Sequence, residues 1–175
     1  MPKKLSPNHQ ELIPYLYYRD PGAAVEFLSK AFGFAVRNVH KTDSGAVMHG
    51  ELGLGKSAVM LGPARAELGF ASPADLPARH AGVWCYVDDA DAHCAKARAA
   101  GATIVREPVD QFYGVREYTA RDAEGQEWFF ATPLAAAKPE KKPRAKKARA
   151  SSARVAKASA KSKRKPAKKS QARRR

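Results

Sequence analysis

The chain has 175 residues and a formal net charge of +15, from 32 Lys and Arg against 17 Asp and Glu. The charge is uneven: residues 1–134 hold 14 basic and 16 acidic side chains, a net of −2, while residues 135–175 hold 18 basic and one acidic side chain, a net of +17. No run of about 18 apolar residues is present, which excludes a transmembrane helix. The polar residues 1–10 argue against a secretory signal, so we expect a cytoplasmic protein without membrane partners.

The composition predicts three segments. Residues 1–10 form a flexible arm, and residues 11–134 are long enough for one domain with a core. Residues 135–175 contain no Phe, Trp, Tyr, Ile or Leu, so burial cannot offset their ordering entropy and we expect a disordered tail. Cys85 and Cys94 have no metal-ligand spacing, and we interpret them as buried thiols.

Within the domain, residues 13–36 and 82–105 repeat one plan: an apolar strand, an acidic turn, a helix of about three turns and a glycine. An aspartate before a helix accepts N–H groups of the first turn, and a glycine after it adopts the left-handed conformation. The predicted caps are Asp20 and Gly33 in the first copy, and Asp89 and Gly101 in the second.

The repeat continues beyond the helices. Residues 45–63 and 115–133 match at a constant offset of 70, and each holds two strand-like runs around a turn. With one more strand after each helix, near 35–40 and 103–107, each module reads as strand, helix and three strands. The predicted boundaries are about 11–63 for module one, 64–81 for a linker and about 82–134 for module two.

Two segments carry a family resemblance. DPGAAVEFLSKAFGF in the first copy and QFYGVREYTARDAEGQEWFFAT in the second resemble the vicinal oxygen chelate superfamily, which includes glyoxalase I, extradiol dioxygenases, fosfomycin resistance enzymes and bleomycin resistance proteins. The resemblance covers about residues 10–134, and FYGVRE and RDAEGQEWFF are most similar to the bleomycin-resistance-like branch. It implies an α+β fold, in which tandem βαβββ modules form a curved mixed-sheet cup with the helices outside, and a two-fold homodimer with its cups between subunits.

The resemblance also allows a test for a metal site. Metal enzymes of the superfamily hold a divalent cation, which acts as a Lewis acid, with a His early in the first strand and a Glu in the last strand of each module. The family spacing places the two His positions at Ile13 and Gly82, and the two Glu positions at Val59 and Phe129. None of these four residues is a cation ligand, so we expect neither a catalytic metal nor another cofactor.

An alternative is a shifted metal site. His49 and Glu51 are two residues apart on one predicted strand and therefore point to one face, and His80 precedes module two. With a third ligand, this face would suit a divalent-metal-dependent glyoxalase- or dioxygenase-type enzyme. The competing interpretation is a polar pair that hydrogen-bonds its neighbours. We assign no chemistry to His9, His40 or His93.

The two-residue period of a strand predicts the faces of the sheets. If Ile13 and Gly82 mark the cup side, the opposite side packs on the helices. An aromatic concavity with a few polar groups is typical of a small-molecule site, although aromatic residues at strand spacing also build ordinary cores. The predicted cup side contains Tyr15, Tyr17, Val59, Leu61, Trp84, Tyr86, Glu127, Phe129 and Ala131. The predicted helix side contains Leu16, Val83, Cys85, Val87, Trp128 and Phe130.

The resemblance adds a rim to this cup. In the bleomycin-resistance-like branch, the loop and strand that match Phe112, Tyr113 and Arg116 border the ligand groove. The planar guanidinium of Arg116 suits an anionic or carbonyl group, with an ordinary cross-strand pair as the alternative. The predicted ligand-binding residues are Tyr15, Tyr17, Trp84, Tyr86, Phe112, Tyr113, Arg116 and Phe129.

The tail resembles linker-histone tails in composition only. Dense like charge is typical of arms that bind nucleic acid or another polyanion without reading base sequence, and a solubilising extension is the alternative. The predicted contacts are Lys146, Lys147, Lys163, Arg164, Lys165, Lys168, Lys169, Arg173, Arg174 and Arg175.

Together, these features predict a small-molecule-binding, antibiotic-sequestering type of protein that lacks a catalytic metal and carries a nucleic-acid-binding tail. The alternatives are the metal-dependent enzyme and a nucleoid-associated protein that uses its folded domain only for dimerisation.

Overall fold

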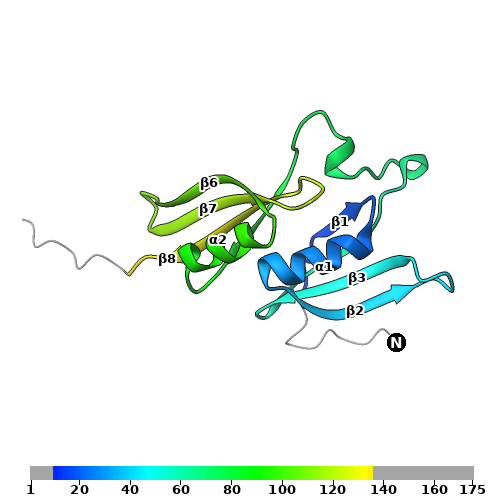
Figure 1. Ribbon diagram of the computed structural model, residues 1–175, viewed down its shortest axis with the longest axis horizontal. Helices are drawn as coiled ribbons and strands as arrows, with labels where there is room; N and C mark the ends of the chain where they lie inside the picture. Colours follow the sequence, from blue (N-terminus) through cyan, green and yellow to red (C-terminus); the bar gives the residue numbers. More distant parts are fainter. Residues whose placement is uncertain (1–9, 136–175) are drawn as a thin grey trace, which may run out of the picture. The chain divides into compact units, whose positions relative to one another are not determined.

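The computed structural model describes residues 10–135 (Figure 1). Residues 1–9 and 136–175 lie outside the described part, and with them most of the predicted arm and the predicted tail. Among the described residues, no helix has both the length and the apolar character needed to cross a membrane.

Both modules have the predicted order of strand, helix and three strands. Module one contains β1 (Tyr15–Tyr18), α1 (Pro21–Phe32), β2 (Ala35–Lys41), β3 (Val47–Leu54) and β4 (Ser57–Pro63). Module two contains β5 (Gly82–Tyr86), α2 (Ala90–Ala99), β6 (Thr103–Asp110), β7 (Val115–Arg121) and β8 (Glu127–Pro133). The linker contains two short 3-10 helices, Ala66–Leu68 and Pro73–Asp75.

Each module forms its own four-stranded mixed sheet, with strand order β1-β4-β3-β2 in module one and β5-β8-β7-β6 in module two. In both sheets the first strand pairs in parallel with the last, and the other pairs are antiparallel. The α+β class is therefore confirmed, and β1 and β5 are the equivalent edge strands of the two sheets.

The helices begin at the predicted aspartates. Asp20 Oδ1 accepts a 3.0 Å hydrogen bond from the backbone N–H of Ala23, and the side chain of Asp89 caps α2 in the same way. Gly33 ends α1 with φ of 73°. In module two the cap is Ala100, and Gly101 follows it with φ of 95°, so this predicted cap was misplaced by one residue.

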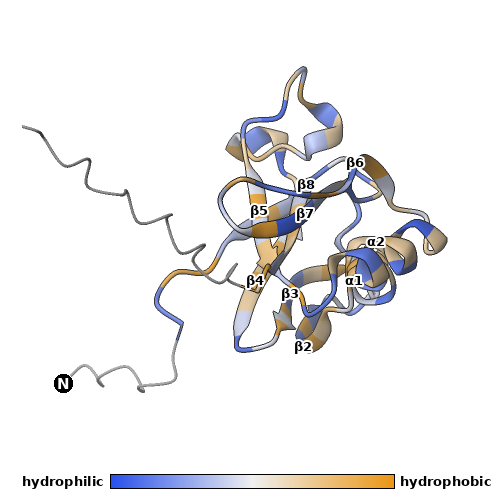
Figure 2. Ribbon diagram, turned by 90° about the vertical axis from the view of Figure 1, so that its left-hand side faces the viewer, coloured by the Kyte–Doolittle hydropathy of each residue, from blue (hydrophilic) through white to orange (hydrophobic). Residues whose placement is uncertain are grey.

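The predicted offset of 70 between the last strands is wrong by one residue. Tyr15 pairs with Met60 in module one and Trp84 with Phe129 in module two, which gives an offset of 69 for both partners. A slip of one residue transfers every side chain to the other face of the sheet. Val59 and Leu61, predicted on the cup side, are accordingly buried in the hydrophobic core. Figure 2 shows the mostly apolar colouring of β4.

The two helices contact each other (Figure 1). The buried side chains of both modules form one core. The ring centroid of Phe32, at the end of α1, lies 4.9 Å from that of Phe130 in β8, and Phe34 lies 5.3 Å from Trp128. The helices therefore lie at the junction of the modules, instead of outside a cup formed by both sheets. The apolar end of α1 explains this arrangement, because the helix side of β8 removes it from water.

The turn between β7 and β8 adds polar links across this junction. The buried carboxylate of Asp122 accepts a hydrogen bond from the Tyr18 hydroxyl, with 2.7 Å between the oxygens. The carboxylate of Glu124 accepts hydrogen bonds from the backbone N–H groups of Arg19 and Asp20, at 2.8 and 2.9 Å. One turn of module two thus holds the start of α1 in module one.

Candidate functional site

The open face of the second sheet, which is the side away from the core, carries five of the predicted ligand-binding residues. The Trp84 ring centroid lies 6.0 Å from that of Phe129 and 6.5 Å from that of Tyr113. Trp84 is 42% exposed and Tyr86 is 63% exposed, unlike their buried neighbour Cys85. We call this cluster the aromatic face, and it comprises Trp84, Tyr86, Phe112, Tyr113 and Phe129.

Tyr15 and Tyr17 form a separate cluster on the open face of the first sheet. Their ring centroids are 5.3 Å apart, and Tyr17 stacks on Phe70 of the linker at 4.4 Å. Among residues 10–135, no ring contact joins this cluster to the aromatic face. The predicted set is therefore divided between two sheets.

Arg116 does not lie with the aromatic face. Its Nε donates to Asp91 Oδ2 on α2 at 2.5 Å, and its Nη1 donates to Asp110 Oδ1 on β6 at 2.7 Å. These hydrogen bonds raise the pKa of Arg116 further above its usual value. Tyr118, two residues along the same strand, is fully buried against α2, so Arg116 projects from the helix side of the second sheet.

Arg106 and Glu117 form an ion pair on the open face of the second sheet, and the sequence did not predict it. The side chain of Glu117 is 1% exposed; its Oε1 accepts a hydrogen bond from Arg106, and its Oε2 accepts one from the Tyr113 hydroxyl at 2.6 Å. The bond to Glu117 raises the pKa of Tyr113. Alternation along β7 places Glu117 with Thr119, which pairs with Phe129. That periodicity could have identified Glu117, but Arg106 required the cross-strand register.

A cavity of about 350 Å³ adjoins the aromatic face along β5. Trp84 and Tyr86 contribute to its wall, and most of the remaining lining is apolar. The side-chain amide of Gln10 accepts a hydrogen bond from the Ala58 N–H and donates one to the Ala58 carbonyl. These bonds hold Gln10, which precedes β1, against β4. Small-molecule sites in proteins have similar volumes and similar apolar walls. The lining residues are Gln10, Leu12, Pro14, Phe34, Leu54, Ser57, Ala58, Val59, Val83, Trp84, Cys85 and Tyr86.

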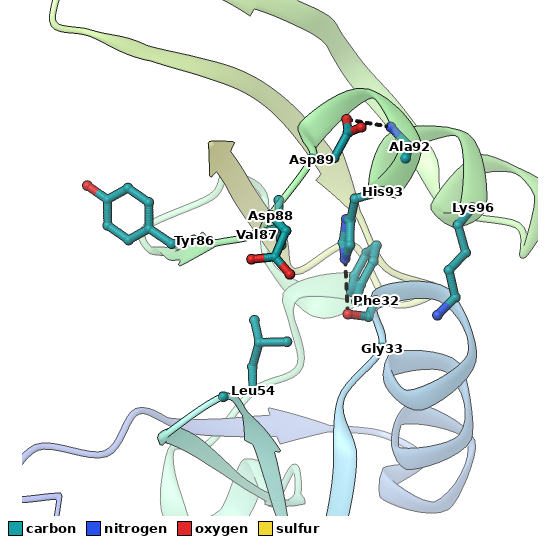
Figure 3. Close-up of a pocket in the computed structure, with 11 residues that line it drawn as sticks. Phe32, Gly33, Leu54, Tyr86, Val87, Asp88, Asp89, Ala92, His93 and Lys96 are labelled. Atoms are coloured by element: carbon teal, nitrogen blue, oxygen red, sulfur yellow. Dashed lines mark hydrogen bonds between the residues drawn. The ribbon is translucent and has the colours of Figure 1, made fainter. Parts of the chain in front are cut away.

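A larger and more open hollow, of about 490 Å³, lies where the end of α1 meets α2 (Figure 3). Its histidine, His93, uses both ring nitrogens: Nε2 lies 3.1 Å from the Phe32 carbonyl oxygen, and Nδ1 lies 2.6 Å from the Tyr118 hydroxyl. Burial lowers the pKa of His93, which favours a neutral ring that donates from Nε2 and accepts at Nδ1. We therefore assign His93 to the module junction and place the candidate site at the aromatic face.

Comparison with known proteins identifies the family. The family model described as Glyoxalase/Bleomycin resistance protein/Dioxygenase superfamily matches residues 8–130. This chain belongs to that superfamily. TioX from Micromonospora sp. ML1 is 31% identical, with a TM-score of 0.58 over 72% of this chain and 100% of TioX. An uncharacterised protein of Mycobacterium bovis is 29% identical over 70% of this chain and 83% of its own length.

More distant structures show the fold alone. A glyoxalase/bleomycin resistance protein/dioxygenase family enzyme from Burkholderia phytofirmans PsJN is 23% identical, with a TM-score of 0.54 over 69% of this chain and 95% of that one.

The residues of this chain do not fit the usual divalent cation of the superfamily's metal enzymes. With the observed register, the four family positions hold Ile13, Met60, Gly82 and Phe129, which offer neither an imidazole nor a carboxylate. The donor set that cation requires is therefore missing from these positions.

The shifted site has two side chains on one face, as predicted. His49 and Glu51 lie on the open face of the first sheet, where His49 Nδ1 is 3.3 Å from the Tyr15 hydroxyl oxygen and Glu51 forms a 3.6 Å ion pair with Arg37. His40 lies directly across from His49, with ring centroids 6.0 Å apart. Between residues 10 and 135, no three His, Cys, Asp or Glu side chains are grouped closely enough to hold a metal ion. His80 is exposed in the linker.

Proposed function

We propose that this protein binds a small molecule with a planar aromatic group at its aromatic face, without a catalytic metal, and thereby sequesters a ligand of the antibiotic type. The observation that carries the proposal is the contiguous ring cluster of the second sheet, whose members Trp84 and Tyr86 also line the 350 Å³ cavity. Exposed apolar clusters commonly mark binding sites, and offset stacking of aromatic rings adds about 1 kcal/mol per pair. Membership of a superfamily that includes ligand-binding proteins supports the same function.

We further propose a two-fold homodimer. Phe112 is 98% exposed at the turn between β6 and β7, and the open faces of the two sheets share no ring contact within the described chain. In a two-fold dimer, the aromatic face of one protomer would meet the Tyr15 and Tyr17 cluster of its partner and complete a cup. Sedimentation equilibrium tests this arrangement: Phe112→Ser should weaken the dimer, whereas a monomeric wild type contradicts it.

Ligand binding is tested by titrating the wild type and Trp84→Ala with glycopeptide antibiotics and aromatic metabolites in a calorimeter. We expect at least one aromatic compound to bind the wild type and to bind Trp84→Ala about tenfold more weakly, because one stacking partner is lost. Val36→Ala, an exposed substitution on β2 of the first sheet, is the control and should bind normally. Equal affinity of wild type and Trp84→Ala would contradict ligand binding at the aromatic face.

We propose that the tail binds nucleic acid or another polyanion and places the protein at the nucleoid in the cytoplasm. The support is a net charge of +17 in residues 135–175. The predicted basic contacts all lie outside the described residues. A gel-shift series in increasing salt should show affinity that falls with a slope of about −0.9 per neutralised phosphate, and a chain ending at Leu134 should lose retention. Equal retention of both chains would contradict a role for the tail.

A second candidate, the metal-dependent enzyme, rests on His49 and Glu51 on one face and on His40 across from His49, although the described side chains are not grouped as a complete metal site. A rise in melting temperature with nickel, zinc, manganese or iron, abolished in His49→Ala, would support it. No rise with any of these cations would leave the binding protein as the explanation. If no ligand binds and the full chain bridges DNA, the domain serves the nucleoid-associated role as a dimerisation platform.

A further inference from the structure

The guanidinium of Arg106 borders the aromatic face, because Glu117 accepts hydrogen bonds from both Arg106 and the Tyr113 hydroxyl. Arg121 lies on the same open face, but its guanidinium is paired with Glu127. We propose that Arg106, held in place by Glu117, selects ligands that carry a carbonyl oxygen on the planar aromatic ring. This inference rests on the proposed function, because it concerns which aromatic molecules the same face prefers.

The register of the second sheet places Arg106 on the ligand side. Arg106 pairs with Thr119 across β6 and β7, Thr119 pairs with Phe129, and Phe129 pairs with Trp84. These four residues therefore form one row across the sheet. Two strand spacings, about 10 Å, separate the Cα atoms of Arg106 and Phe129. A bicyclic ring stacked near Phe129, together with its carbonyl substituent and the arginine side chain, spans that distance.

Glu117 accounts for the orientation of Arg106. A buried carboxylate is costly unless partners satisfy it, and both Glu117 oxygens are used, one by Arg106 and the other by Tyr113. The core lies on the other face of this sheet, so this costly ion pair serves the open face. Its effect is to fix a guanidinium and a phenol beside the rings before a ligand arrives, which reduces the entropy lost on binding.

Arg106 keeps donors for a ligand. Its side chain is 47% exposed, and within residues 10–135 only its Nη2 has a hydrogen-bond acceptor. A guanidinium has five N–H donors in a plane, so one edge is available to an acceptor oxygen. Because Glu117 balances its charge, the pair is neutral as a whole and suits an amide or ester carbonyl. Arg116 is differently placed, since both sides of its guanidinium are bonded to Asp91 and Asp110.

The experiment compares quinoline with quinoline-2-carboxamide by isothermal titration calorimetry on the full chain. In the wild type we expect the carboxamide to bind about tenfold more tightly, which is the usual effect of one good hydrogen bond. Arg106→Lys should abolish this preference while retaining a cation for Glu117, and the readout is the ratio of the quinoline and quinoline-2-carboxamide affinities within each protein. Arg106→Met with Glu117→Gln removes the buried charge as well, and provides a second variant if the first is unstable.

Arg116→Lys tests the competing arginine on the other side of the same sheet. The proposal is overturned if the preference for the carboxamide persists in both Arg106 variants, or if Arg116→Lys is the variant that loses it. It is also overturned if quinoline binds and the carboxamide gains nothing, an outcome that leaves the proposed aromatic binding intact. If neither compound binds the wild type, the proposed function fails for this class of ligand, and the selectivity fails with it.

Discussion

The hydroxyl of Tyr18, at the end of the first strand, donates a 2.7 Å hydrogen bond to a buried carboxylate oxygen of Asp122, which is 104 residues away in the second module. The same oxygen accepts from Trp128 Nε1 at 3.0 Å, and the other oxygen accepts from the backbone N–H groups of Glu124 and Gln126. The four donors oppose the effect of burial, which dominates and raises the pKa of Asp122. One side chain thus joins both modules and shapes the turn between β7 and β8.

We therefore expect Asp122→Asn to destabilise the protein by about 2–3 kcal/mol, because an amide nitrogen cannot accept the bonds that one carboxylate oxygen now receives. Urea unfolding followed by circular dichroism measures the change. Asp43→Asn is the control, since Asp43 is exposed in the turn between β2 and β3, and it should change stability by less than about 0.5 kcal/mol. Equal stabilities of the two variants would show that Asp122 does not link the modules.

His93 predicts a dependence of stability on acid. Burial lowers the pKa of His93 below its usual 6.5, so the unfolded chain takes up a proton more readily than the folded one. The contribution of neutral His93 to the free energy of unfolding is fully present above pH 6.5. It is lost as the pH falls through the lowered pKa. Melting temperatures measured from pH 8 to pH 5 should fall more steeply for the wild type than for His93→Gln, whose amide can keep both hydrogen bonds. His80→Gln should behave like the wild type, and parallel curves for wild type and His93→Gln would contradict the assignment.

The register of β4 predicts a large loss of stability at one residue and a small loss at its neighbour. Leu61 is fully buried in the core, whereas Met60 is half-buried on the open face. Leu61→Ala should therefore cost about 2–5 kcal/mol, and Met60→Ala about 1 kcal/mol or less. Chemical denaturation of both variants measures the difference. The reverse order would restore the face assignment derived from an offset of 70.

The cysteines should react slowly in the folded protein. Burial raises the pKa of the Cys85 thiol to about 12, and it also raises the pKa of Cys94. Since the thiolate is the reactive form, we expect a disulfide reagent at pH 8 to modify the native thiols about a hundredfold more slowly than the unfolded ones. Cys94→Ser isolates the reaction of Cys85, and a fast native reaction of this variant would show that Cys85 is accessible.

Much of the fold follows from local chemistry that a sequence displays. Asp20 and Asp89 cap the helices because their carboxylates are close to free N–H groups in any such helix. The alternation around Trp128 and Phe130 correctly placed both on the helix side, where they are fully buried. These features depend on neighbours within a few residues.

The parts that could not be predicted depend on pairing between distant residues. The two modules differ in the turn before their last strand, which joins Leu54 to Ser57 in module one and Arg121 to Glu127 in module two. A constant offset of 70 ignores this difference and therefore misplaces Val59 and Leu61. The pairing of Arg106 with Thr119 places its side chain on the open face. No local sequence pattern distinguishes Arg106 from Arg116, which lies on the other face. The packing of α1 against module two likewise depends on contacts between Phe32 and β8.

The turn between β7 and β8 also determines the smallest part of this chain that can fold independently. Module one alone would leave the Tyr18 hydroxyl without its acceptor and the Phe32 and Phe34 rings without their cover, and module two alone would leave the Asp122 carboxylate without one of its donors. The β3–β4 turn of module one has only the two residues Gly55 and Lys56 between its paired ends. It is too short to hold an acidic side chain equivalent to Asp122. The two repeated modules are therefore complementary, and we expect that neither folds stably without the other.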